Sequence, residues 1–208
     1  MLTLPDRDLI LASSSQTRRK MLDDAGLTHQ AVSAGVDEES LKDAARAEGL
    51  NNRDAATMLA EMKAVKISNQ HPGAYVIGSD QLLDLNGEWF SKPETINEAK
   101  SHLQKLSGQA HDLVTAAVIY RDGERIWQEV SIPQISIRTL SDEDIDHYLG
   151  MMGEKMTYTP GVYMIEDLGA QIISKIKGCP YAVLGLPLLE MLSFLRGHGL
   201  SYKENSSC

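Results

Sequence analysis

Hydroxyl and guanidinium side chains follow directly after the first apolar run of the chain. Residues 9–12 read LILA, and three serines come before Arg18 and a second arginine. The apolar run predicts a short buried strand, and the spacing of Met21 and Leu22 predicts a helix, so the serines lie where that helix begins. Backbone N–H groups of a first helical turn, with hydroxyls and guanidinium groups, can hold a phosphate. Residues 13–18 are therefore a candidate phosphate site, although a serine N-cap followed by solvated arginines gives the same pattern.

Carboxylates and lysines further along the chain are candidates for acid–base and cation chemistry. Asp80 follows the apolar run AYVIGS, which predicts a buried strand with this carboxylate at its carboxyl end. Ligands of α/β proteins gather at such strand ends, although aspartates there also cap turns. Asp37 and Glu38 form a second acidic corner, which a solvated turn would also explain. Lys63 and Lys92 are candidates for anion binding, with ordinary surface lysines as the alternative.

Composition excludes several functional classes. The chain has 208 residues, a net charge of -9 and only 5% aromatic residues, which disfavours an RNA-binding or other nucleic-acid surface. Two cysteines cannot form a disulfide framework or a cysteine-built zinc site, and the histidines lack metal spacing. No apolar run approaches the roughly 18 residues of a membrane span, and no signal peptide is evident. We therefore expect a cytoplasmic protein without membrane contact.

The remaining pattern predicts strands and helices that alternate only in part. Helices are expected at 52–70, 95–106 and 142–152 and after Pro187, and the expected strand regions include GVYMIED and YAVL. Asn86-Gly87 and Asp122-Gly123 predict hairpin turns. The pairs Thr95 with Glu98 and Ser141 with Asp144 predict capping boxes. We predict an α/β fold, a mixed sheet with flanking helices, in which residues 1–200 form one domain of two lobes and residues 201–208 form a flexible tail.

Read together and in order, the motifs resemble those of the Maf family of nucleoside triphosphate pyrophosphatases. The family's opening ASxSPRR motif corresponds to LASSSQTRR at residues 11–19. The other matching segments are VDE at 36–38, LAEMKA around Lys63, IGSDQ at 77–81, KPET from Lys92, the run EAxxxLxxLSGxxHxxxTA at 98–116, and VLGLPL at 183–188. Seven motifs in the family's order cover nearly the whole chain.

The resemblance implies a Maf-type twisted mixed sheet with two lobes around a nucleotide cleft, and a homodimer. It implies hydrolysis of a nucleoside triphosphate to the monophosphate and pyrophosphate with a divalent cation, Mg²⁺ or Mn²⁺. Asp80 becomes the general base, and Glu38 with Asp80 faces the cation. The residues that match the family's phosphate site are Ser13, Ser15, Arg18, Lys63 and Lys92.

Base choice depends on three positions in the resemblance: Thr17, Gln81 and Glu166. The Maf subgroup that favours thymidine and uridine triphosphates has arginine, threonine and glutamine there. The subgroup that acts on 7-methyl-GTP has tryptophan, glutamine and glutamate, which this chain matches at the last two positions. A carboxylate at position 166 can accept hydrogen bonds from the N1–H and exocyclic amine of guanine. The resemblance therefore predicts a role in removing modified nucleotides such as 7-methyl-GTP.

The chain departs from the family pattern at two places. The proline of the opening motif is replaced by Gln16, which precedes the small residue Thr17, and the family's Gly-Asp near the end is Gly178-Cys179. A different class of function, a non-catalytic nucleotide-binding regulator of cell division, would use the same cleft. The presence of Asp80 together with Glu38 and both lysines favours the enzyme, because a pure binder needs no base.

Overall fold

The computed structural model describes residues 9–198, which form two compact units. The first unit contains residues 9–81, 115–131 and 181–198, and the second contains residues 82–114 and 132–180. Within residues 9–198, no helix is both long and apolar enough to cross a membrane. The predicted flexible tail, residues 201–208, lies outside the described residues.

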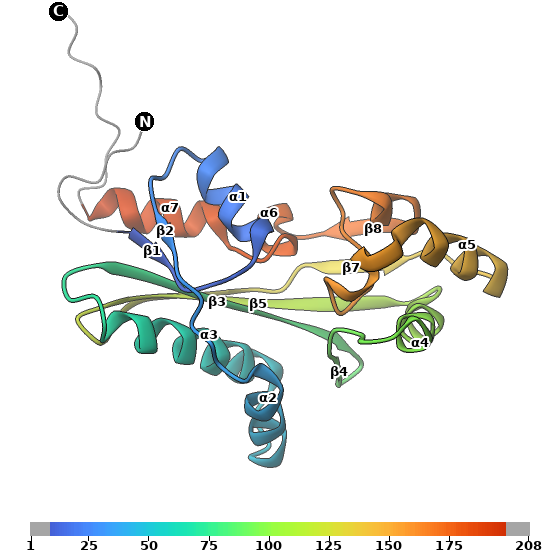
Figure 1. The fold of residues 1–208 in the computed structure, drawn as a ribbon, viewed down its shortest axis with the longest axis horizontal. Helices are drawn as coiled ribbons and strands as arrows, with labels where there is room; N and C mark the ends of the chain where they lie inside the picture. Colours follow the sequence, from blue (N-terminus) through green and yellow to red (C-terminus); the bar gives the residue numbers. More distant parts are fainter. Residues whose placement is uncertain (1–8, 199–208) are drawn as a thin grey trace, which may run out of the picture. The chain divides into compact units, whose positions relative to one another are not determined.

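The first unit contains parallel and antiparallel strand pairs covered by helices (Figure 1). Its strands are β1 (Leu9–Leu11), β2 (Gln30–Ala31), β3 (Tyr75–Leu85), β5 (Ala110–Arg121) and β6 (Glu124–Ser131), of which β3 and β5 continue into the second unit. Strand β1 pairs in parallel with β2 and β3, and β5 pairs antiparallel with β6. The helices are α1 (Gln16–Asp24), α2 (Glu38–Ala47), α3 (Asn52–Ser68) and α7 (Leu188–Gly197).

Alternation along β3 decides which helix each side chain meets. Tyr75 and Ile77 belong to a buried apolar cluster with residues of α1 and α7. Because successive strand residues point to opposite faces, Gly78 and Asp80 face the other side, where α3 lies (Figure 1). The strand thus presents Asp80 to α3.

Helix α3 packs against β3 at unusually close range. A Cβ atom at Gly78 would lie only 2.2 Å from the Ala60 carbonyl oxygen and 2.7 Å from the Ala64 Cβ. No residue except glycine fits this space without displacement of the helix. Lys63 lies three residues after Ala60 and hence on the same helix face. The close approach brings the Lys63 side chain to the strand.

The second unit is mostly antiparallel. Its elements are the ends of β3 and β5, β4 (Glu88–Phe90), α4 (Ile96–Leu106), β7 (Gln134–Ile137), α5 (Asp142–Met152), η1 (Gly153–Thr157), η2 (Leu168–Gln171) and β8 (Ile173–Lys177). Strand β4 pairs with β3, and β7 pairs with both β5 and β8. The mixed α/β sheet with flanking helices is therefore confirmed.

The predicted turns and most predicted caps are confirmed. Asn86 and Asp122 both have positive φ and precede glycines that also have positive φ, as hairpin turns of this kind require. Ser141 and Asp144 form the full capping box of α5. Thr95 caps α4, but the Glu98 carboxylate accepts a hydrogen bond from the backbone N–H of Glu94, so that box is not reciprocal.

Three predictions about the strands are wrong. Asp80 is inside β3 and not at its end, because the hairpin with β4 extends the strand to Leu85. The segment GVYMIED contains no strand and folds into turns around Val162, whose φ is 59°. The run YAVL is not a strand, because residues Pro180–Val183 form the short helix α6, whose first position suits proline. Helix α2, which starts at Glu38, was not predicted.

Candidate functional site

The Lys63 ammonium group lies between two carboxylates. Its Nζ donates to Asp80 Oδ1 at 2.6 Å and lies 2.6 Å from Glu38 Oε1. Lys63 and Asp80 are buried, whereas the Glu38 side chain is 43% exposed. The second carboxylate oxygen of Asp80, Oδ2, is buried and has no hydrogen-bond partner within residues 9–198. This buried acceptor is available to a proton or a cation.

The start of α2 orients Glu38. Asp37 is the N-cap of α2, and its carboxylate accepts from the Ser40 backbone N–H at 3.1 Å and from the Ser40 hydroxyl at 2.7 Å. These hydrogen bonds lower the pKa of Asp37. Glu38 therefore stands at the first position of a capped helix, from which it reaches Lys63.

The predicted phosphate segment forms the start of α1. Ser15 is the N-cap, and its Oγ accepts from the Arg18 backbone N–H at 3.3 Å. Ser13 Oγ accepts from the Ser15 backbone N–H at 3.2 Å and from Arg18 Nη1 at 3.4 Å. Hydroxyls, helix N–H groups and a guanidinium thus converge within six residues, as anion binding requires. The N-cap predicted for one of these serines is confirmed at Ser15, but Arg18 is not the solvated arginine of that alternative, and phosphate binding stays a prediction.

Arg18 is held in place by the backbone near α7. Its Nε donates to the Gly185 carbonyl oxygen at 2.8 Å. Burial lowers the pKa of Arg18, while the negative charges of Asp80 and Glu38 oppose this effect. The guanidinium therefore lies within electrostatic reach of the two carboxylates that contact Lys63.

Gln81 lies on the strand face opposite to Asp80. Its Nε2 donates to Thr115 Oγ1 at 2.8 Å and to the carbonyl oxygens of Ala182 and Val183 at 2.9 and 3.1 Å. Because its amide hydrogens are used in these bonds, the group that remains for a ligand is its carbonyl oxygen. Thr17, the other base-choice position of the first unit, lies in the first turn of α1 and is partly exposed.

Two predicted site residues, Lys92 and Glu166, belong to the second unit. Lys92 is exposed and follows β4, and Glu166 is exposed in the turn before η2. The eight others, Ser13, Ser15, Thr17, Arg18, Glu38, Lys63, Asp80 and Gln81, belong to the first unit.

Sequence reasoning missed the groups that support these side chains. The Ser79 hydroxyl lies 2.8 Å from both the Ala116 and the Gly185 carbonyl oxygens, and Thr115 Oγ1 donates to the Ala182 carbonyl at 2.8 Å. Thr115 lies in the run at 98–116 and Gly185 lies in VLGLPL. The sequence therefore indicates both motifs, but not the hydrogen bonds that these two residues make. Backbone carbonyl groups carry no sequence signal, which explains the omission.

The residues present fit a divalent cation that is shared with phosphates. Within residues 9–198, no three His, Cys, Asp or Glu side chains are arranged to hold a metal ion by themselves. Mg²⁺ usually takes one or two carboxylates together with substrate phosphates and waters. The unpartnered Asp80 Oδ2 and the adjacent Glu38 match that incomplete donor set.

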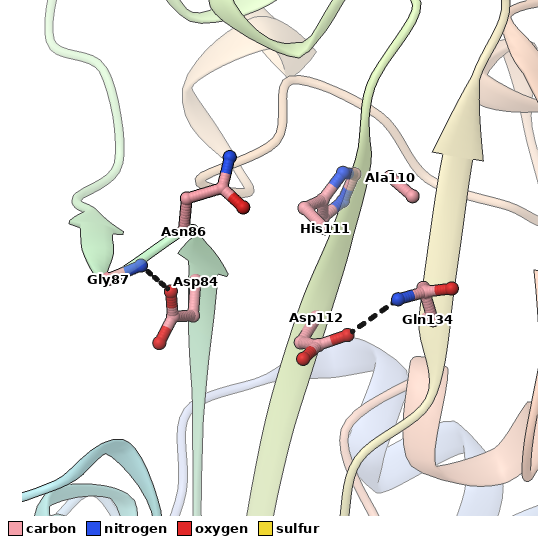
Figure 2. Close-up of a pocket in the computed structure, with 7 residues that line it drawn as sticks. All are labelled: Asp84, Asn86, Gly87, Ala110, His111, Asp112 and Gln134. Atoms are coloured by element: carbon pink, nitrogen blue, oxygen red, sulfur yellow. Dashed lines mark hydrogen bonds between the residues drawn. The ribbon is translucent and has the colours of Figure 1, made fainter.

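The second unit contains a separate polar cavity of about 300 Å³. Figure 2 shows its lining residues, Asp84, Asn86, Gly87, Ala110, His111, Asp112 and Gln134. Asp84 accepts from the Gly87 backbone N–H at 2.7 Å, and Asp112 accepts from Gln134 Nε2 at 3.2 Å. None of the sequence-predicted site residues lines this cavity.

The fold and the first-unit cluster define an α/β protein with a candidate site for a phosphate-bearing anion. The chain belongs to the family described as Maf-like protein, whose model matches residues 8–198. Proteins named nucleoside triphosphate pyrophosphatase are similar to it. The protein from Rhodospirillum rubrum is 42% identical over 92% of this chain and 95% of its own. The one from Caulobacter vibrioides is 44% identical over 91% and 94%, and the one from Hyphomonas neptunium 43% identical over 89% and 93%. The resemblance to the Maf family is confirmed.

Proposed function

We propose that the protein is a nucleoside triphosphate pyrophosphatase, a hydrolase that releases the monophosphate and pyrophosphate. The observation that carries the proposal is the contact of Lys63 with both Asp80 and Glu38, within electrostatic reach of Arg18. The names of the similar proteins support the same activity. A binding protein needs the cationic groups, but it does not need a buried carboxylate with an unused oxygen.

The side chains divide the chemical work between them. Asp80 Oδ2 is the acceptor for the proton of the water that attacks the α-phosphorus. Ser13, Ser15 and the first N–H groups of α1 donate to phosphate oxygens, and Arg18 adds a fixed positive charge. Lys63 stabilises the negative charge that develops as the bond to pyrophosphate breaks. Lys92 is proposed as a further phosphate ligand.

Glu38 and Asp80 would hold the divalent cation, Mg²⁺ or Mn²⁺. When bound, the cation supplies charge neutralisation to the phosphates. Lys63 contacts Asp80 through Oδ1, so Asp80 Oδ2 could bind the cation while the ion pair with Lys63 stays in place. The homodimer implied by the resemblance and the cytoplasmic location expected from the sequence belong to the same proposal.

The test incubates the purified protein with a panel of nucleoside triphosphates and Mg²⁺ and measures pyrophosphate. We expect release in the wild type and a fall in kcat of at least about a hundredfold in Asp80→Asn, which removes the base and a cation ligand. Asp84→Asn is the matched control, because it makes the same change four residues along β3 and should retain wild-type turnover. Nucleotide binding without pyrophosphate release would favour the non-catalytic regulator of cell division.

For base choice we propose a preference for 7-methyl-GTP, set by Thr17, Gln81 and Glu166. Glu166 accepts from the guanine N1–H and exocyclic amine, and the positive charge of the methylated base strengthens this contact. Thr17 cannot stack as tryptophan does, so we expect a preference of about ten- to two-hundredfold in kcat/KM over dTTP. Comparison of 7-methyl-GTP, GTP, dTTP and UTP in wild type and Glu166→Gln tests this. A wild-type preference for dTTP or UTP contradicts it.

A further inference from the structure

The segment that carries Glu166 is wound tightly. Val162 has a φ of 59°, a strained conformation that β-branched residues rarely adopt. A Cβ atom at Gly161 would lie only 2.3 Å from a ring carbon of Tyr163, so the ring packs directly over the backbone. Such a conformation persists only when neighbouring groups hold it.

Hydrogen bonds from the rest of the second unit hold this segment. The Tyr163 hydroxyl lies 2.6 Å from His111 Nε2, and both side chains are buried. Tyr148 donates its hydroxyl to the Val162 carbonyl oxygen at 3.0 Å. Thr159 Oγ1 accepts from the Tyr163 backbone N–H at 3.2 Å and donates to the Tyr163 carbonyl at 2.8 Å. The backbone three residues before Glu166 is therefore fixed from several sides.

His111 lies at one end of this series of contacts, on a regular strand. It belongs to β5, where it pairs with Ile135 of β7, and it lines the cavity of Figure 2. Burial lowers its pKa to about 4, so the ring is neutral at neutral pH. Its Nδ1 has no hydrogen-bond partner within residues 9–198, so the contact with Tyr163 is its one observed polar side-chain bond there.

We propose that His111 is a positioning residue for base selection, which holds Tyr163 and thereby fixes the backbone that presents Glu166. This role rests on the proposed function and deepens it. A carboxylate selects a base by directed hydrogen bonds, and such selection needs a fixed geometry. The proton transfer at Asp80 does not use this segment. Loosening it should therefore reduce discrimination between bases and leave the chemical step intact.

The experiment loosens the anchor without altering Glu166. Tyr163→Phe removes only the hydroxyl, and Tyr75→Phe is the matched control, a buried tyrosine of the first unit. His111→Leu removes the nitrogen, whereas His111→Gln can place an amide group near the position of Nε2 and should restore the contact. The first readout is amide hydrogen exchange of residues 160–167, and the second is kcat and KM for 7-methyl-GTP and dTTP.

We expect exchange at residues 160–167 to rise about tenfold in Tyr163→Phe and His111→Leu, the scale of one lost buried hydrogen bond, but not in His111→Gln or Tyr75→Phe. The ratio of kcat/KM values should fall about tenfold towards that of Glu166→Gln, mainly through KM for 7-methyl-GTP. Adding Tyr163→Phe to Glu166→Gln should change the ratio no further, because both act on one contact.

Three results overturn this proposal and leave the proposed function standing. The first is unchanged exchange at residues 160–167 in both Tyr163→Phe and His111→Leu, which would show that His111 does not anchor the segment. The second is an active wild type whose base ratio is unchanged in these variants. The third is an equal loss of kcat for every nucleotide. A wild type that releases no pyrophosphate from any nucleotide refutes the proposed function instead, and the exchange measurement still decides whether His111 anchors the segment.

Discussion

Lys63 has the most demanding environment of any side chain at the candidate site. Its ammonium group is almost completely buried and is compensated by one buried and one half-exposed carboxylate. Removing one partner of such a pair leaves an uncompensated charge, which costs more than the pair itself contributes. The Lys63 ammonium group, a proposed phosphate ligand, is thus also needed for the stability of the unit.

Lys63→Met should lower the free energy of unfolding by about 3 kcal/mol, because the Asp80 charge then stays buried without its partner. The Lys63→Met, Asp80→Asn double variant should recover part of this loss, since the buried charge is gone. Urea unfolding at pH 7 of the wild type, both single variants and the double variant measures the coupling. Strictly additive losses would contradict a direct Lys63–Asp80 interaction.

The types of these residues could be predicted, but their pairing could not. Asp80 and Lys63 stand out because charged residues within apolar runs need a reason. Their contact depends on the backbone spacing of α3 and β3, which no local pattern encodes. The same limit applies to Gln81, whose partners Ala182 and Val183 lie about a hundred residues away and contribute only carbonyl groups.

At the scale of single elements, the N-cap of α1 belongs to the candidate phosphate site, whereas the N-cap of α5 serves only its helix. Ser15 and Ser141 make the same N-cap contact to the third helical residue, but only Ser15 belongs to the candidate phosphate site. Ser141→Ala should cost about 1 kcal/mol of stability with little change in kcat/KM. Ser15→Ala should cost a similar amount of stability and also reduce kcat/KM for every triphosphate. Thermal unfolding and steady-state kinetics of the two variants test this, and equal kinetic losses would exclude a phosphate role for Ser15.

Elements with strong periodicity or clear caps could be predicted, whereas segments fixed by distant contacts could not. The helix at 52–68 follows from its apolar spacing, and the helix at 142–152 from its capping box. The apolar residues of 161–167 resemble a strand in sequence, yet hydrogen bonds from Tyr148 and His111 hold them in turns. Tertiary contacts outweigh local propensity there.

At the scale of the whole molecule, each unit is assembled from separate stretches of chain. The first unit uses three stretches within residues 9–198, and the second uses two. One of the boundaries between the units falls between Gln81 and Leu82, inside one continuous strand. Two lobes were predicted, but this boundary could not be, because neither glycine, proline nor a change in composition marks it.

Stability of the molecule should depend on His111 in acid. Its pKa is about 4 in the folded protein and 6.5 ordinarily, so between these values the unfolded chain binds the proton and the folded chain does not. The contribution is complete above about pH 6.5 and is lost as the pH falls through 4, with a total on the order of 3 kcal/mol. His111→Gln cannot titrate, so the stability of the wild type relative to this variant should fall from pH 7 to pH 4. A constant difference in urea unfolding would contradict the buried neutral ring.

The missing side chain at Gly78 limits how this sequence can diverge. An alanine there would meet the Ala60 carbonyl and the Ala64 methyl group, and the helix could accept it only by moving away from the strand. Such a movement would lengthen the 2.6 Å contact between Lys63 and Asp80. Position 78 carries no reactive group, yet it works as a spacer between two charges. A smaller residue at position 64 would remove the methyl contact but not the contact with the Ala60 carbonyl, which belongs to the backbone, so no substitution in the helix opens position 78 to a side chain while the helix stays in place.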